Sequence, residues 1–151
     1  MIEAVHEAGH AVVARLLAQP IKRTALAGVT TRYRRGDTKA HRQQAIIALA
    51  GTCAEDRHTG YTPEQRAQLW ETAWREDLFN AMRHLDASGG GMIAPVKRAA
   101  ERLVREHWNA IERVATALRV TRSTRCSLRG RPRGKMPLPT LDFSPSMSAS
   151  L

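Results

Sequence analysis

Two histidines and a glutamate near the start of the chain stand at a spacing that suits metal chemistry. His6, Glu7 and His10 form the pattern H-E-x-x-H. On a helix, side chains four residues apart project from the same face, so both imidazoles can direct a nitrogen at one ion. Zn²⁺ suits imidazole ligands and, in catalytic sites, takes three protein ligands and a water molecule. The pattern therefore predicts that His6 and His10 bind zinc.

Glu7 is placed to act as a general base at such a site. A bound Zn²⁺ lowers the pKa of its water toward about 7, and a neighbouring carboxylate can accept the proton. The alternative is an amphipathic helix whose two histidines face solvent. The motif is embedded in an apolar run, which favours a position at the edge of a core instead. We therefore expect Glu7 to activate a metal-bound water.

A third protein ligand is needed, and the sequence offers several. Asp77 is favoured because its neighbours on the predicted helix include Trp74 and Ala81, and a carboxylate on an apolar face is costly unless it is paired or metal-bound. Asp77 could instead lie on the solvated side and pair with Arg75 or Arg83. The other candidates are histidines and carboxylates elsewhere in the chain: His41, His58, His84, His107, Glu55, Asp56 and Glu76.

The elements that must position these residues are mostly helical. Apolar residues at three- and four-residue spacing predict a helix from Ile2 that ends before Pro20. Residues 21–37 combine β-branched and aromatic residues with glycines, which predicts a short β-hairpin or an irregular edge. Helical spacing returns over residues 40–57.

The second half of the domain is also predicted to be helical. Thr62 and Pro63 are typical of a helix start, and that helix is expected to reach Leu85, with or without a break. The glycines at 89–91 predict a flexible interruption, and apolar spacing predicts a last helix over about 95–118. The expected fold class is therefore mainly α, with one short hairpin after the first helix.

The positive charge of the chain is concentrated near its C-terminal end. The protein has 24 Lys and Arg against 14 Asp and Glu, a net charge of +10, and half of that excess lies in residues 120–151. This segment is rich in arginine, serine and proline, and its small apolar surface cannot offset the entropy of ordering it. We therefore divide the chain into a domain at 1–119 and a disordered tail at 120–151. The basic tail could bind nucleic acid non-specifically.

Several classes of protein are not expected from this sequence. No apolar run is long enough to cross a membrane. The start of the chain does not have the pattern of a secretory signal peptide. Cys53 and Cys126 are far apart and form no CxxC pair, which argues against a disulfide framework or a cysteine zinc site. A cytoplasmic location is the default expectation.

Four stretches of the chain together resemble one known family. They are AVHEAGHAVV at 4–13, IALAGTCAED at 47–56, WREDLFNA at 74–81 and REHWNAI at 105–111. In order and spacing they are similar to the zinc peptidase domain of FtsH-type AAA metalloproteases. The first resembles the zinc helix, the second a Leu-Gly-Gly-Arg-Ala-Ala-Glu-Glu helix, and the third the segment with the third zinc ligand. The resemblance covers residues 2–118.

The resemblance implies a helical, zincin-like peptidase domain with defined site residues. It implies that His6, His10 and Asp77 are the zinc ligands, converging even without metal, and that Glu7 is the general base. Glu55 matches the first of the family's two glutamates, and the resemblance makes it an outer partner of a ligand histidine. The chain has no G-x-x-x-x-G-K-[ST] motif, so the match implies a stand-alone domain without the family's ATPase module.

Two functions of different classes follow from these features. The first is a zinc endopeptidase that cleaves unfolded or flexible polypeptides, either as a homo-oligomer or with a separate ATPase that delivers them. The second is a catalytically weak zinc-binding module whose basic tail binds nucleic acid or a protein partner. The full set of ligands and base favours the first function. The missing ATPase and the basic tail favour the second, and the chain departs from the family pattern at Thr52, Asp56 and Glu76.

Overall fold

The structure is a computed structural model of the 151-residue chain that describes residues 1–25, 28–31 and 37–127. In chain order the elements in these ranges are α1 (Ile2–Leu16), β1 (Ile21–Ala25), β2 (Gly28–Thr31), α2 (Thr38–Thr59), α3 (Pro63–Glu71), α4 (Arg75–Ala87), α5 (Ile93–Glu106) and α6 (Trp108–Ser127). The prediction of a mainly helical fold is confirmed, and so is the hairpin, in which β1 and β2 pair antiparallel. None of the described helices is both long and apolar enough to cross a bilayer.

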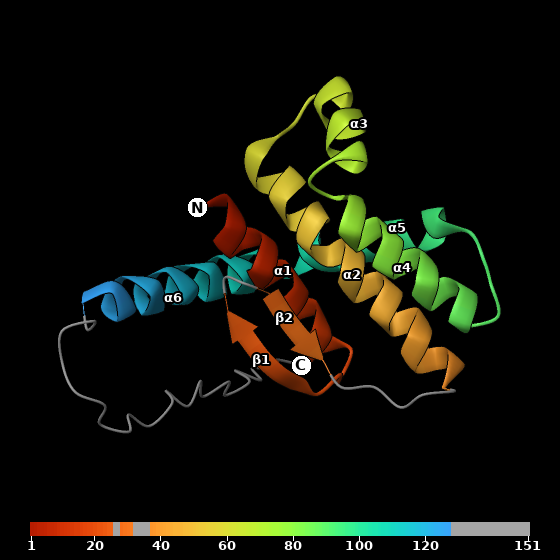
Figure 1. The fold of residues 1–151 in the computed structure, drawn as a ribbon, viewed down its shortest axis with the longest axis horizontal. Coiled ribbons are helices and arrows are strands. Elements are labelled where there is room, and N and C mark those ends of the chain that lie inside the picture. The colour runs from red at the N-terminus through yellow and green to blue at the C-terminus, as the bar shows by residue number, and fades with distance from the viewer. Residues whose placement is uncertain (26–27, 32–36, 128–151) are drawn as a thin grey trace, which may run out of the picture.

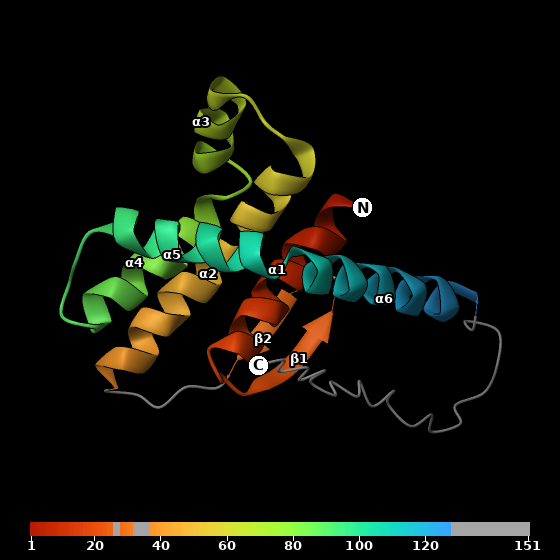
Figure 2. The same cartoon turned by 180° about the vertical axis from the view of Figure 1, so that it is seen from behind.

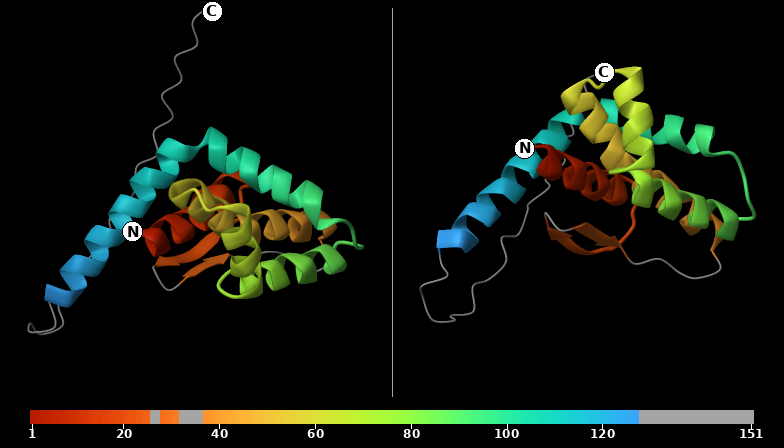
Figure 3. Two further views of the ribbon diagram at one scale, coloured as in Figure 1. Left: turned by 90° about the horizontal axis from the view of Figure 1, so that it is seen from above. Right: turned by 45° about the horizontal axis from the view of Figure 1, so that its top comes forward.

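The elements are arranged in three layers. α1 and α2 form the middle layer, with the hairpin and α4 on one side of it (Figure 1). α5 and α6 cover the other side, α5 against α2 and α6 against α1 (Figure 2). Seen from above, α6 extends well beyond the rest of the domain (Figure 3). The H-E-x-x-H motif, on α1, therefore lies in the middle layer, packed against α2.

Small residues at the contact of α1 with α2 let the two backbones approach closely. A Cβ at Gly9 would lie 2.6 Å from the carbonyl oxygen of Ala50 and 2.8 Å from the Cβ of Ala54. Ala8, Ala50 and Ala54 are fully buried around this point. The close approach brings the histidine-bearing face of α1 directly against α2.

The break predicted between residues 62 and 85 lies at residues 72–74. α3 begins with a capping box, in which the Thr62 hydroxyl accepts from the Gln65 N–H and the Gln65 side chain accepts from the Thr62 N–H. None of the α3 residues is buried, whereas Trp74, at the start of α4, is only 1% exposed. Trp74 thus anchors α4 in the core while α3 stands away from it (Figure 1).

The prediction of one last helix over 95–118 is wrong, because α5 ends before His107 and α6 starts after it. The bend lets α5 pack against α2 while α6 turns to pack along α1, and no breaker residue in the sequence marks it. α6 continues to Ser127, so the domain boundary predicted at 119 falls inside a helix. The rest of the predicted tail, 128–151, lies outside the described residues.

Candidate metal centre

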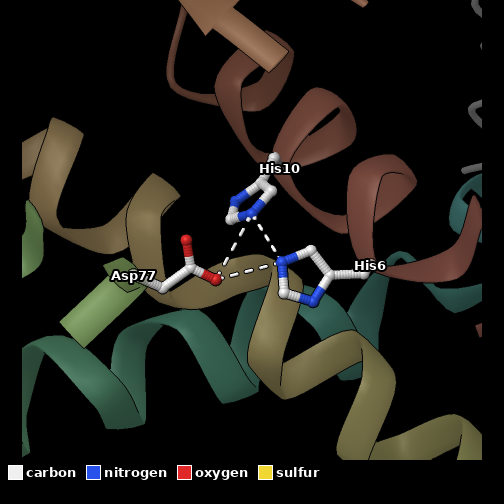
Figure 4. A group of neighbouring side chains, drawn as sticks. All are labelled: His6, His10 and Asp77. Atoms are coloured by element: carbon white, nitrogen blue, oxygen red, sulfur yellow. Dashed lines mark hydrogen bonds and ion pairs between the residues drawn. The ribbon is translucent and has the colours of Figure 1, made fainter. Parts of the chain in front are cut away.

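Two helices bring three potential metal ligands to one point. His6 and His10 lie one turn apart on α1, and Asp77 lies in the first turn of α4. Figure 4 shows both imidazoles and the carboxylate facing one another. Asp77 Oδ2 is 3.0 Å from His6 Nε2 and 3.6 Å from His10 Nε2, and the two Nε2 atoms are 3.1 Å apart. The structure thus has the convergence that the family resemblance implies.

The spacing of these atoms fits a single tetrahedral ion. Two ligand atoms that each lie about 2.0–2.1 Å from a zinc ion at the tetrahedral angle are about 3.3 Å apart. The observed separations of 3.0, 3.1 and 3.6 Å lie on both sides of that value. The donor set of two imidazoles and one carboxylate is also one that zinc prefers in catalytic sites.

The outer nitrogen of each imidazole has a hydrogen-bond acceptor of its own. His10 Nδ1 lies 2.7 Å from the carbonyl oxygen of Ile47, and His6 Nδ1 lies 2.9 Å from Glu55 Oε2. A carbonyl oxygen or an ionised carboxylate can only accept, so each Nδ1 must carry the hydrogen. In a neutral imidazole, Nε2 then points an unshared electron pair at the space between the three side chains. Proteins orient metal-binding histidines in this way.

Without a cation, these inward-facing atoms repel one another, so one imidazole must take up a proton. Burial lowers the pKa of His6, but hydrogen bonds and charge attraction from Asp77 and Glu55 outweigh it and raise that pKa to about 9. Burial would raise the pKa of Asp77, but His10 and His6 hold it well below its ordinary value. The surroundings therefore stabilise one positive charge between these side chains, and either a proton or a metal ion can supply it.

Glu55 lies behind His6, where the resemblance implies an outer partner. Its side chain is buried on α2, and its two oxygens contact different groups, Oε2 facing His6 and Oε1 accepting from the Tyr61 hydroxyl at 3.1 Å. Burial would raise the pKa of Glu55, but hydrogen bonds with His6 and its other neighbours, Tyr61 among them, lower it. Glu55 is therefore ionised and keeps the hydrogen of His6 on Nδ1.

Glu7 lies beside the three converging side chains and lines the same cavity. Its Oε2 atom is buried and makes no hydrogen bond within the described chain. Burial raises the pKa of Glu7, although the nearby His10 and His6 oppose the rise. A buried carboxylate oxygen with no partner is costly unless a further group, such as a water, binds there. The position and the raised pKa suit a group that accepts a proton.

Gly51 of α2 is part of the site, and its role was not predicted from the sequence. A Cβ at this position would lie 2.3 Å from His10 Nε2 and 2.7 Å from His6 Nε2. Any larger residue would therefore displace the nitrogens that face the centre. A glycine in the interior of a helix is unfavourable by about 0.5–1 kcal/mol relative to alanine, and this cost is the signal that could have identified it.

The candidate centre opens on a cavity of about 470 Å³ between α1, β2, α2 and α4. His6, Glu7, His10 and Asp77 line one part of it. Val29 and Thr31 of β2 and Glu76 and Asn80 of α4 are among the other lining residues. The volume lies within the range of about 300–1,000 Å³ that is typical of ligand sites.

The other predicted ligand candidates lie elsewhere or have other contacts. His41 Nδ1 and His84 Nδ1 are 3.0 Å apart, and His84 lines the cavity. Asp56 pairs with Arg66 at 3.3 Å, and the His58 ring lies against Trp108. Glu76 lines the cavity but is not one of the three converging ligands, and His107 lies at the junction of α5 and α6.

Comparison with known proteins gives no assignment. No protein-family model matches the chain, and searches of curated proteins and of solved structures find no match. The functional argument therefore depends on the geometry of the site. The outward hydrogen bonds of both histidines, the unpartnered Glu7 oxygen and the space left by Gly51 all fit a metal ion bound by His6, His10 and Asp77.

Proposed function

We propose that this protein is a zinc-dependent endopeptidase. The observation that supports the proposal most directly is the orientation of His6 and His10, whose Nδ1 atoms face acceptors and whose Nε2 atoms converge with Asp77 Oδ2. The ligands in this proposal are His6, His10 and Asp77. When bound, Zn²⁺ lowers the pKa of a water molecule and polarises a carbonyl group.

The position of Glu7 beside the proposed ligands and its raised pKa both suit proton transfer. Its buried Oε2 atom accepts the proton of the attacking water, and the rise in its pKa brings it closer to neutral pH. The same oxygen then donates that proton to the amide nitrogen that leaves. Ile47 and Glu55 hold the two imidazoles in one orientation during this transfer.

The strand that lines the cavity supports a polypeptide substrate. β2 lines the cavity through Val29 and Thr31, and it pairs with β1 along one edge. An extended peptide that adds to a strand edge binds through its backbone groups, so peptides of many different sequences can bind. Such binding requires an unfolded or flexible chain. We therefore propose that the substrates are unfolded polypeptides.

The resemblance to FtsH-type peptidase domains supports the same activity and raises the question of delivery. Folded substrates need an unfolding motor, which a separate ATPase partner or a larger assembly of this chain would have to provide. The competing proposal is a catalytically weak zinc module whose basic C-terminal segment binds nucleic acid or a protein. Both proposals include zinc, so metal content alone does not separate them.

Hydrolysis of denatured casein by the purified protein and by Glu7→Gln tests the proposal. Glutamine keeps the size of the side chain and cannot act as a base. We expect equal zinc content in the two proteins and a rate about 10²–10⁴-fold lower in the variant, the usual contribution of a general base. Chelated wild type is the matched control, because it should be inactive and should recover on addition of zinc.

Each outcome of this experiment has a defined meaning. Equal rates in wild type and Glu7→Gln would reject the endopeptidase proposal and leave the zinc-module proposal. Loss of zinc from the Glu7→Gln variant would show that Glu7 holds the metal, contrary to the role given to it here. Absence of zinc from the wild-type protein would reject both proposals.

A further inference from the structure

A chain of hydrogen bonds extends from the candidate metal centre to the loop after α2. The Tyr61 hydroxyl donates to Glu55 Oε1 at 3.1 Å, and Glu55 Oε2 accepts from His6 Nδ1 at 2.9 Å. His6 Nε2 is the atom that faces the centre. Tyr61 is thus separated from the centre by one carboxylate and one imidazole.

The Glu55 carboxylate is held in one orientation by these donors on its two oxygens, and the Trp74 indole is a further donor near the same carboxylate. Its side chain is buried, so water cannot readily replace a missing donor at Oε1. The torsion that turns a carboxylate is broad rather than confined to staggered positions. Loss of the Tyr61 hydroxyl would leave His6 and the Trp74 indole as the remaining donors to the group, which could then rotate more freely. Rotation would change the acceptor that His6 Nδ1 meets and tilt the imidazole.

Tyr61 is itself held by contacts that do not involve the metal centre. Gly60 ends α2 in a left-handed conformation, with φ +69°, and turns the chain so that Tyr61 lies over the end of the helix. Arg66 donates to the carbonyl oxygen of Tyr61 from Nε at 3.0 Å and from Nη2 at 2.8 Å, and it also pairs with Asp56 at 3.3 Å. The Tyr61 ring packs edge-to-face on Trp74, with centroids 5.7 Å apart. The hydroxyl therefore reaches Glu55 from a fixed position.

We infer that Tyr61 is a positioning residue for the metal site, which acts on His6 through Glu55. This inference rests on the metal binding in the proposed function and adds a residue that the H-E-x-x-H pattern does not contain. Partners of this kind affect metal affinity and the geometry of the metal without contacting the metal. The loss of one hydrogen bond to a charged acceptor is expected to weaken zinc binding about tenfold, the lower end of the range for outer partners of metal ligands.

The variant Tyr61→Phe tests the inference because it keeps the ring on Trp74 and removes only the hydroxyl. Zinc release to a chelator is measured by stopped flow, and the visible absorption of the Co²⁺-substituted protein is recorded. We expect release about tenfold faster than in wild type and a shifted Co²⁺ spectrum. Circular dichroism should show an unchanged fold, and the melting temperature of the chelated protein should stay close to that of wild type.

Two comparisons separate positioning from a general loss of structure. Thr72→Val removes a hydroxyl that donates to the Gln68 carbonyl near the start of α4, away from Glu55, and should leave zinc release unchanged. In a Glu55→Ala background, Tyr61→Phe should have no further effect on zinc release, because the connection to His6 is already broken.

If the wild-type protein binds zinc and the Tyr61→Phe variant has the same release rate and Co²⁺ spectrum, the inference is overturned and the proposed function stands. An equal effect of Tyr61→Phe in the presence and absence of Glu55 would also overturn it, since Tyr61 would then act by another route. Wild type without zinc would instead reject the proposed function itself.

Discussion

Gly51 of α2 lies so close to the imidazole of His10 that a Cβ on the glycine would stand 2.3 Å from His10 Nε2. Helix α2 therefore contributes the Ile47 carbonyl and the Glu55 carboxylate to the site. It also leaves space there, because residue 51 has no side chain. The His6 and His10 nitrogens that face the candidate metal centre have room only because position 51 is glycine. The identity of this residue is therefore tied to those histidines rather than to the conformation of the helix.

Replacement of this glycine by alanine is expected to weaken zinc binding with little effect on the fold. Alanine is normally favoured over glycine inside a helix by about 0.5–1 kcal/mol. At position 51 the methyl group would instead push the imidazoles of His6 and His10 out of position, and side chains of this kind can move without unfolding the protein. We expect zinc affinity to fall by about 100-fold, measured by competition with a chromogenic chelator.

The contrasting variant is Gly9→Ala, where the added methyl would meet the backbone of Ala50 and the Cβ of Ala54 instead. Backbone cannot rotate away, so this variant should lower the melting temperature even in the presence of a chelator. A Gly51→Ala protein with wild-type zinc affinity would show that the site is more open than the structure indicates.

Some residues of the site could be predicted from the sequence, and others could not. His6 and His10 could be predicted because their spacing on one helix places them together whatever the rest of the fold does. Its apolar neighbours made Asp77 only the favoured one of several candidates, and the resemblance singled it out, since residues so distant in sequence meet only through the packing of α4 on α2. The Ile47 carbonyl and the Tyr61 hydroxyl could not be predicted, because a backbone acceptor and a loop tyrosine have no distinctive local pattern.

Most of the helical fold could also be predicted from local sequence patterns. The bend between α5 and α6 and the length of α6 could not. The first helix and the hairpin follow from apolar spacing and from β-branched residues between glycines. The bend at His107 was missed because no proline or glycine stands there, and the helix bends so that α5 and α6 can cover different helices. The extension of α6 to Ser127 was missed because composition describes the tail as a whole rather than residue by residue.

His10, the proposed ligand in the third turn of α1, should be indispensable for zinc. His10 is buried, and its removal leaves two protein ligands, which hold a catalytic zinc weakly. We expect His10→Ala to contain less than about a tenth of the zinc of wild type by elemental analysis. His58→Ala is the control, since His58 lies beside Trp108 and should keep its zinc. Undiminished zinc in His10→Ala would refute the ligand assignment.

Removal of the chain after Arg119 should leave the stability of the domain nearly unchanged. Among the α6 residues up to Val120, whose side chains the structure describes, the last that pack in the core are Ile111 and Ala115, with Leu118 partly buried against it, and Val120 is 60% exposed. Surface residues without core contacts contribute within about 0.5 kcal/mol each. Thermal melts of the two proteins should therefore agree within a few degrees. A much lower melting temperature after truncation would show that residues beyond 119 belong to the folded domain.

The stability of the metal-free protein should depend on pH through His6. The ordinary pKa of histidine is 6.5, and in the folded protein Asp77 and Glu55 outweigh burial and raise the pKa of His6 to about 9. A raised pKa means that the folded state binds the proton more tightly than the unfolded state does. The resulting stabilisation is fully present below pH 6.5 and is lost as the pH rises through 9.

Zinc should reverse this dependence, because the metal takes the place of the proton on His6. Zinc affinity is expected to rise by about tenfold per pH unit between pH 7 and 9, where one proton must leave on binding, and to level off above 9. Chelator-buffered zinc titrations and thermal melts with and without chelator measure the two trends. In Glu55→Gln one of the two charges that raise the pKa of His6 is gone, so both trends should end at lower pH. A metal-free protein whose melting temperature does not change between pH 6.5 and 9 would show that His6 is neutral in the fold, and zinc would then bind without displacing a proton.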